Sequence, residues 1–153
     1  MIDPRNFREA LSRYPTGVAL VAAAYEGKAV AMTVNSFASV SLDPPLILWS
    51  VDRTSDRYAA FAAAEQFSVN ILRADQADLA KHFAMEAEIE RADWTTNSDG
   101  IPLLNKALAR LECRRYAVHQ GGDHDIIVGE VLKLKADGQG DALTYFRSQY
   151  GKT

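Results

Sequence analysis

The sequence predicts a mainly β protein: an antiparallel barrel of six or more strands with two or three helices packed at its ends. Strand-like runs recur between turns rich in glycine and proline, and only a few segments have helical spacing. The links between neighbouring runs are too short for crossover helices, which excludes a Rossmann arrangement. At 153 residues the chain is long enough to bury a substantial core. We therefore expect one domain over residues 1–153.

The first third is expected to begin with a helix and continue as strands. Asp3 is suited to be the N-cap and Pro4 the first helical residue, with an apolar face of Phe7, Ala10, Leu11 and Tyr14. Strands are predicted at residues 18–25, 28–37 and 45–51, with a turn at residues 26–27. Their short links indicate an antiparallel meander.

The middle third alternates helix, strand and helix. A helix over residues 54–66 is expected to be capped by Thr54 or Ser55, and a buried strand follows at residues 67–72. A second helix begins at Asp75 and places Leu79, Ala80 and Phe83 on one face. The acidic residues 86–102 indicate a surface loop in which Trp94 serves as an anchor.

The last third returns to strands. Residues 107–118 alternate, so Cys113 is expected on a buried face as a small core residue. A glycine-rich turn, "QGGDH", leads into a strand at residues 125–135, and a second turn at 136–141 precedes a strand at 142–146.

Composition excludes several classes of function. The formal net charge is -3 and basic residues are scattered, so nucleic acid is not an expected partner. The amino terminus does not resemble a signal peptide, and no apolar run is long enough for a membrane span. One cysteine cannot form an internal disulfide, and the cytoplasm is the expected location. The sequence contains no GxGxxG motif placed after a strand, no GxxxxGK[ST], no HExxH and no GxSxG.

Three features remain as candidate sites. The stretch "MTVNSFASVSLDPP" has strand spacing but carries five small polar side chains, which fits either a solvated strand or a binding surface. In "SVDRTSDR", a strand leads through a loop with Arg53 and hydroxyls to a helix, which fits either a phosphate site or an ordinary cap. His124 enters a strand from the glycine-rich turn, and no metal site is expected from the three histidines.

Seven segments in order resemble the flavin reductase-like family, the small reductase components of two-component flavin monooxygenases. They are "YPTGVALV", "MTVNSFASVSLDPPLILWSVDRTS", "FSVNIL", "DQADLAKHFA", "LECR", "GGDHDIIVGEV" and "LTYFRSQY". The resemblance extends from about Phe7 to Tyr150. It implies an antiparallel, Greek-key-like split β-barrel that forms a homodimer and binds FMN or FAD near the interface.

The resemblance also implies roles for individual residues. The isoalloxazine ring is expected along Thr33, Val34, Asn35 and Ser36, with the hydroxyl groups of Ser39 and Ser41 nearby. The phosphate is expected at the loop formed by Ser50, Val51, Asp52, Arg53, Thr54 and Ser55. His124 is expected beside the nicotinamide, Phe83 in the flavin site, and Tyr150 or Tyr145 near the pocket.

The function implied is an NAD(P)H-dependent flavin reductase. NADH or NADPH would transfer hydride to FMN or FAD, and the reduced flavin would serve a partner monooxygenase. Hydride transfer requires mainly positioning and electrostatics, which agrees with the lack of an acid, base or nucleophile motif. Two alternatives stay open: a flavoprotein that retains FMN tightly, and a non-enzymatic flavin-binding module.

Overall fold

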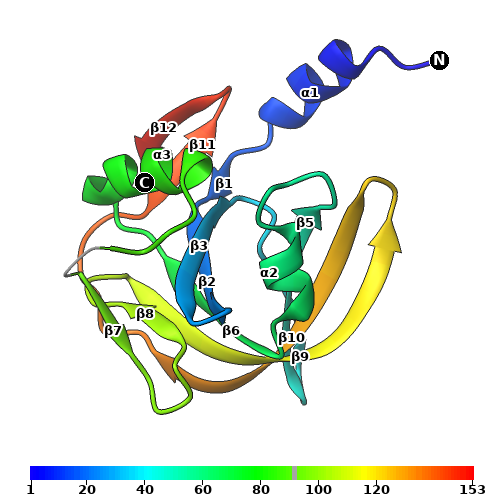
Figure 1. The fold of residues 1–153 in the computed structure, drawn as a ribbon. Coiled ribbons are helices and arrows are strands. Elements are labelled where there is room, and N and C mark those ends of the chain that lie inside the picture. Colours follow the sequence, from blue (N-terminus) through cyan, green and yellow to red (C-terminus); the bar gives the residue numbers. More distant parts are fainter. Residues whose placement is uncertain (91–92) are drawn as a thin grey trace.

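The computed structural model describes residues 1–90 and 93–153 (Figure 1). Helical segments are α1 (Pro4–Ser12), α2 (Tyr58–Ala63), the short 3-10 turn η1 (Ala74–Gln76) and α3 (Ala77–Met85). Strands are β1 (Thr16–Gly17), β2 (Ala19–Tyr25), β3 (Lys28–Val34), β4 (Ala38–Leu42), β5 (Pro45–Asp52), β6 (Gln66–Ile71), β7 (Trp94–Thr96), β8 (Pro102–Leu104), β9 (Ala109–Gly121), β10 (His124–Lys135), β11 (Leu143–Phe146) and β12 (Gln149–Lys152).

A seven-stranded antiparallel sheet forms the body of the protein, in the order β3-β2-β6-β9-β10-β5-β4. The long strands β9 and β10 curve below the other strands and form a ribbon that extends beyond them (Figure 1). A three-stranded sheet, β1-β11-β12, and the hairpin of β7 and β8 lie beside this body. The predicted mainly β, antiparallel fold class is confirmed.

The predicted continuous meander over the first strands is wrong. Strands β3 and β4 are neighbours in sequence but lie at the two opposite edges of the seven-stranded sheet. Residues 35–37 therefore cross between the edges, and they belong to no strand. The Ser36 hydroxyl binds this connecting segment to β5, because it accepts a hydrogen bond from the Ser50 amide at 3.0 Å. Strand pairing here is decided by contacts that are distant in sequence, which short links do not reveal.

Two apolar clusters stabilise the two faces of the sheet. Strand β2 alternates between them: Val21 belongs to the cluster around Trp49, whereas Leu20 belongs to the cluster around Phe83. Trp49 contacts the ring of Phe61 edge to face, with centroids 5.1 Å apart. Cys113 is buried in the first cluster, as predicted. Burial of the Cys113 thiol raises its pKa to about 12, so it is not a nucleophile at neutral pH.

The first helix begins as predicted but does not pack as an amphipathic helix usually does. The Asp3 carboxylate accepts a hydrogen bond from the Arg5 amide, and Pro4 opens the helix. No residue of α1 is buried, and the helix projects away from the body (Figure 1). Its apolar side chains Phe7 and Leu11 are more than half exposed, as is Tyr14 just beyond its end.

The predicted capping of the helix over residues 54–66 by Thr54 or Ser55 is wrong. Helix α2 begins at Tyr58, and its N-cap residue, Arg57, makes no side-chain cap hydrogen bond. The Thr54 hydroxyl binds the Asp52 carboxylate instead, and the Ser55 hydroxyl accepts from the Arg57 amide. The loop uses these hydroxyls within its own turns, so they do not reach the helix amides.

The surface loop predicted for residues 86–102 contains the short strand β7, and its partner strand β8 begins at the last residue of the loop, Pro102; residues 91–92 lie outside the described part. Trp94 anchors this segment as predicted, since its ring packs edge to face on Phe83 at 5.8 Å. The predicted buried face of α3 is also confirmed, with Leu79, Ala80 and Phe83 buried. Among the described helices, none is long and apolar enough to cross a membrane.

Candidate functional site

A hollow of about 200 Å³ opens where β3 ends, between α3 and the hairpin of β11 and β12. It is lined by Val18, Thr33, Val34, Asn35, Ala84, Tyr145 and Tyr150. Four of the predicted flavin-site residues, Thr33, Val34, Asn35 and Tyr150, thus meet at one place. A smaller apolar hollow shares Val18 with it and includes Phe37.

The strand edge beside this hollow has backbone groups to offer. Strand β3 is an edge strand. The loop after α3 covers its outer edge at Ala29 and Ala31, because the Ala31 amide donates to the Ala87 carbonyl at 2.8 Å and the Ile89 amide donates to the Ala29 carbonyl at 3.0 Å. Outward-facing backbone groups alternate along a strand, so those of Thr33 point to the same edge as those of Ala31, and Asn35 follows directly after the strand ends at Val34. In the described part of the chain, no backbone hydrogen bond covers that edge beyond Ala31. This stretch resembles a strand edge that receives a planar ligand with donors and acceptors.

A buried arginine fixes the α3 side of the hollow. The Arg57 guanidinium donates to the carbonyls of Phe83 and Ala84, the latter at 3.0 Å. These carbonyls lie at the carboxyl end of α3, where the helix dipole is negative. Thr33 binds the same helix, since its hydroxyl donates to the Ala80 carbonyl at 2.6 Å. The position of Ala84 in the hollow wall therefore depends on both residues.

Two tyrosines form the opposite wall. Tyr145 and Tyr150 are paired across the hairpin, and their ring centroids lie 5.2 Å apart. Both are half-buried. Burial raises the pKa of Tyr150, and Tyr145 adds to this effect, so the phenol stays protonated at neutral pH. The wall is aromatic and uncharged, which suits stacking against a flat ring.

The remaining predicted residues gather at the end of β5 and the start of β10. The Thr54 amide and hydroxyl both donate to the Asp52 carboxylate at 2.8 Å, which lowers the pKa of Asp52. His124 lies opposite Asp52 in the register of β5 and β10. The His124 Nδ1 is 2.7 Å from the Asp123 carboxylate. His124 does not line the hollow at the end of β3.

Arg53 is held by the turn that carries His124. Its Nε donates to the Asp125 carboxylate at 2.9 Å, its Nη1 to the Gly122 carbonyl at 2.7 Å and its Nη2 to the His124 carbonyl at 3.2 Å. Tyr58 donates to the other Asp125 oxygen at 2.5 Å. The hydrogen bonds from Tyr58 and then Arg53 lower the pKa of Asp125. Three of the five guanidinium N–H groups are thus engaged within the protein.

One hydrogen bond joins the two groups of residues. Ser36 follows Asn35 of the hollow and binds the Ser50 amide, and Ser50 precedes Asp52 by two residues, about 6.6 Å along a strand. Ser36 therefore connects the chain beside the hollow to the strand that leads into the loop of Thr54 and Ser55.

The other predicted residues do not line the hollow. Phe83 and Val51 are fully buried in the two apolar clusters. Ser39 and Ser41 lie on β4, where Ser39 is exposed and Ser41 is half-buried. Sequence reasoning missed Arg57, Tyr58 and Asp125. Asp125 directly follows "GGDH", and strand alternation could have suggested that its side chain and that of His124 point to opposite faces.

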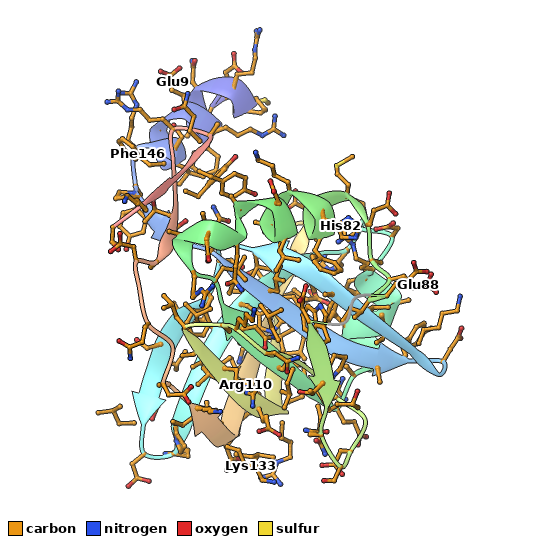
Figure 2. All side chains as sticks on the ribbon, turned by 90° about the vertical axis from the view of Figure 1, so that its left-hand side faces the viewer. Glu9, His82, Glu88, Arg110, Lys133 and Phe146 are labelled. Carbon is orange, nitrogen blue, oxygen red and sulfur yellow. The ribbon has the colours of Figure 1, made fainter. Side chains whose placement is uncertain are left out.

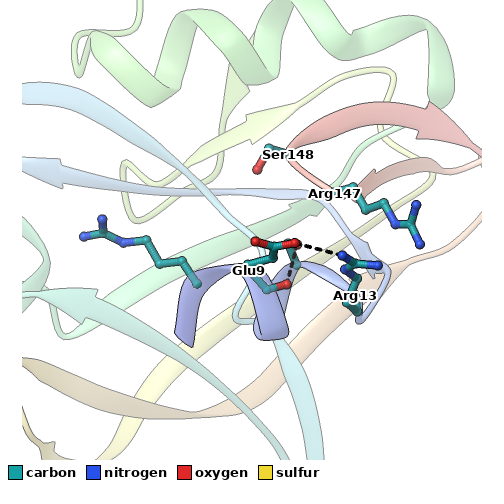
Figure 3. Close-up of a pocket in the computed structure, with 6 residues that line it drawn as sticks. Glu9, Arg13, Arg147 and Ser148 are labelled. Carbon is teal, nitrogen blue, oxygen red and sulfur yellow. Dashed lines mark hydrogen bonds and ion pairs between the residues drawn. The ribbon is translucent and has the colours of Figure 1, made fainter. Parts of the chain in front are cut away.

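A basic hollow lies elsewhere, between α1 and the turn of the β11–β12 hairpin (Figure 3). It is lined by Arg8, Glu9, Ser12, Arg13, Arg147 and Ser148. The Arg147 amide donates to the Ser12 carbonyl at 2.9 Å, and Arg13 pairs with Glu9 at 2.9 Å. Figure 2 shows Glu9 of α1 and Phe146 of the β11–β12 hairpin at the same end of the molecule, far from Arg110 and Lys133.

Comparison with known proteins identifies relatives over nearly the whole chain. A family model described as "Flavin reductase like domain" matches residues 11–153. The FMN reductase (NADH) SmoA of Agrobacterium fabrum is 46% identical over 151 residues, covering 98% of this chain and 86% of that protein. The reductase subunit HsaB of a flavin-dependent monooxygenase from Rhodococcus jostii is 36% identical, covering 97% of this chain and 77% of that protein.

Solved structures show the same architecture. BorF, the flavin reductase component of a bacterial two-component tryptophan halogenase, superposes with a TM-score of 0.91 at 35% identity and 98% coverage of both chains. The NADH:FAD oxidoreductase SgcE6 of Streptomyces globisporus, in complex with NAD and FAD fragments, gives a TM-score of 0.91 at 31% identity. It covers 100% of this chain and 96% of that chain.

Proposed function

The chain belongs to the flavin reductase-like family, and from that premise we propose that it reduces free FMN or FAD with NADH or NADPH and supplies the reduced flavin to a partner monooxygenase. One observation supports this function most directly. Thr33, Val34, Asn35, Tyr145 and Tyr150 surround one hollow beside an uncovered strand edge. This arrangement offers hydrogen bonds to one rim of a flat ring and aromatic surface to its face.

The residues present fit a flavin. Its pyrimidine rim needs paired donors and acceptors, which the outer edge of β3 at Thr33 and the adjoining backbone of Asn35 offer. Small side chains here leave that edge accessible. The hollow of about 200 Å³ is below the usual size of a ligand pocket, so it receives part of the ligand and leaves the rest open. An open, partial site suits a flavin that binds and leaves as a substrate.

The connection through Ser36 between the hollow and the β5–α2 loop supports a place for the ribityl phosphate. We assign the phosphate to the loop of Thr54 and Ser55, which lies beyond the Ser36 to Ser50 hydrogen bond. Backbone amides and hydroxyl groups are suitable donors to phosphate oxygens. The Thr54 amide and hydroxyl donate to the Asp52 carboxylate, so a phosphate bound here would take the Ser55 hydroxyl as a donor or replace Asp52 as the acceptor of Thr54.

Catalysis by this chain consists of placing two rings. The bound flavin supplies the acceptor and the nicotinamide supplies the hydride. The protein holds the flavin rim at β3 and limits its tilt with Tyr145 and Tyr150. His124, half exposed at the rim of the β9–β10 ribbon, is assigned to the nicotinamide side. No residue transfers a proton in the hydride step, so the rate depends on how closely the flavin and nicotinamide rings are placed and oriented.

We further propose that the protein functions as a homodimer. Helix α1 buries none of its residues, and Phe7, Leu11 and Tyr14 remain exposed. Exposed apolar side chains also occur on the large sheet, at Val40, Leu42, Tyr116, Val118, Leu132 and Leu134. Apolar surface on this scale is typical of a protein interface. A second copy would cover it and complete the open hollow.

The function is tested by steady-state oxidation of NADH and NADPH at 340 nm, with FMN, FAD and riboflavin as acceptors. We expect turnover that depends on added flavin, and a colourless protein after gel filtration. A yellow protein that turns over without added flavin would support a retained prosthetic group instead. No flavin-dependent oxidation and no flavin affinity would contradict the proposed function and favour a structural role.

A further inference from the structure

Arg53 supplies hydrogen bonds to an entire turn. Its side chain donates to the carbonyls of Gly122 and His124, and its own amide donates to the intervening carbonyl of Asp123 at 3.1 Å. Three consecutive carbonyls are therefore bound by one residue. The fourth contact is the carboxylate of Asp125, at 2.9 Å from Nε.

The turn needs such a constraint. Residues 116 to 123 of the β9–β10 ribbon are mostly exposed, and beyond Arg115 the strand β9 pairs only with β10. Gly121 and Gly122 lie at the tip, and Gly122 has a φ of 66°. Two adjacent glycines restrict the backbone little, so the sequence of the tip alone does not hold His124 in one place.

Tyr58 and Asp125 form the rest of the clamp. The Asp125 side chain is nearly buried, at 12% exposed, and the Arg53 side chain is 35% exposed. Tyr58, on the first turn of α2, binds the second oxygen of the same carboxylate. The carboxylate is thus fixed from two sides, and a fixed carboxylate orients the planar guanidinium.

We propose that Arg53 is a positioning residue: it holds the Gly122–Asp125 turn so that His124 is placed for the nicotinamide nucleotide. This inference rests on the proposed function. It differs from the expectation that Arg53 is a phosphate ligand, because it assigns the guanidinium to the nicotinamide half of the reaction. Arg53→Gln then weakens the use of NADH or NADPH and leaves flavin affinity unchanged.

The test compares Arg53→Gln with the wild type and with Arg114→Gln. Arg114 pairs with Glu130 across the same ribbon, at an exposed position away from the turn, so its variant controls for loss of an arginine. We expect Arg53→Gln to raise the KM for the nicotinamide about tenfold or more, because small displacements of a positioning group have large effects. The Kd values of FMN and riboflavin, from flavin fluorescence, should change less than about twofold.

A double-mutant cycle separates positioning from general stability. In a His124→Ala background, Arg53→Gln should have no further effect on the nicotinamide KM, because the group that it positions is absent. Tyr58→Phe keeps Arg53 but releases one side of Asp125, and it should raise the same KM by a smaller factor. This variant carries the test if Arg53→Gln does not fold.

Three results would overturn the inference. One is a loss of affinity for FMN but not for riboflavin in Arg53→Gln, which would identify a phosphate ligand. Another is an equal effect of Arg53→Gln with and without His124. The third is an unchanged nicotinamide KM in both Arg53→Gln and Tyr58→Phe. An inactive but folded wild type would instead contradict the proposed function.

Discussion

At the scale of single residues, small polar side chains in this protein connect segments rather than fill space. Ser36 is the clearest case, because its hydroxyl joins the crossing between the sheet edges to β5. Thr33 joins β3 to α3, and Arg57 holds the end of the same helix. The small polar side chains of residues 32–45 thus fix the positions of neighbouring segments beside the hollow.

Replacing Ser36 tests both tasks of this residue. We expect Ser36→Phe to weaken FMN binding about tenfold or more, because a bulky ring would occupy space between the hollow and the Thr54 loop. Ser36→Ala removes only the hydrogen bonds of this hydroxyl with the Ser50 amide and carbonyl, and should cost about 1 kcal/mol of stability with little change in FMN affinity. Isothermal titration and urea unfolding measure the two effects. Wild-type FMN affinity in Ser36→Phe would show that the stretch is only a structural crossing.

Cys113 is expected to be unreactive in the folded protein. Burial raises its pKa from 9.0 to about 12, so the thiolate is scarce at pH 8. Iodoacetamide should modify the native protein far more slowly than the protein in urea. The unfolded thiol ionises first as the pH rises, so this residue lowers stability above pH 9 and has no such effect below it. Rapid native labelling at pH 8 would contradict the buried position.

At the scale of elements, the two long strands of the ribbon determine how closely the sheet can pack. The pairing of β10 with β9 shifts register between Val128 and Gly129 and between Val131 and Lys133, and such irregularities bend paired strands. Gly129 lies at the first of these. A Cβ atom at this position would lie 2.6 Å from the Phe67 ring and 3.3 Å from the Cys113 Cβ. Close approach of β10 to β6 and β9 therefore requires glycine.

Gly129→Ala should destabilise the protein by about 1–3 kcal/mol, the usual cost of one additional methyl group in a packed core. The measurement is the urea midpoint and the slope of the unfolding transition. Gly17→Ala is a suitable control, because no atom lies within 4 Å of a Cβ built at Gly17. If both variants had the same stability, the packing of Phe67 against β10 would be looser than the structure indicates.

At the scale of the whole molecule, the body is packed on both faces of its sheet, whereas α1 and the ends of the long strands are not. Helix α1 meets the β11–β12 hairpin at a hollow lined by charged and hydroxyl side chains (Figure 3), and its apolar side chains Phe7 and Leu11 are exposed. This uncovered surface is where we propose that a second copy binds.

Two charges on the apolar face of α1 should convert the protein to a monomer. We expect Phe7→Glu with Leu11→Glu to halve the mass measured by light scattering after gel filtration, and to lower flavin turnover because the open hollow loses its cover. Arg5→Glu places a glutamate on the opposite face of the helix and should leave the mass unchanged. A wild-type protein that is already monomeric at micromolar concentration would contradict the dimer.

The sequence by itself determined the elements and their class. The antiparallel β architecture, the Asp3 cap, the turn at residues 26–27, the buried face of α3 and the anchor Trp94 all follow from local patterns. Seven segments in order also identified the family. These features were predictable because alternation, capping and turn geometry depend on residues only a few positions apart.

Only the tertiary structure decided which edges meet and which polar groups remain free. Strands β3 and β4 lie at opposite edges of the sheet, so the crossing at Ser36 could not be read from adjacent strand signals. Arg53 looked like a free cation in its loop, yet its partners Gly122, His124 and Asp125 lie about seventy positions away in the sequence. Hydrogen-bond donors are assigned by proximity in space, and proximity between distant segments arises only when the chain folds.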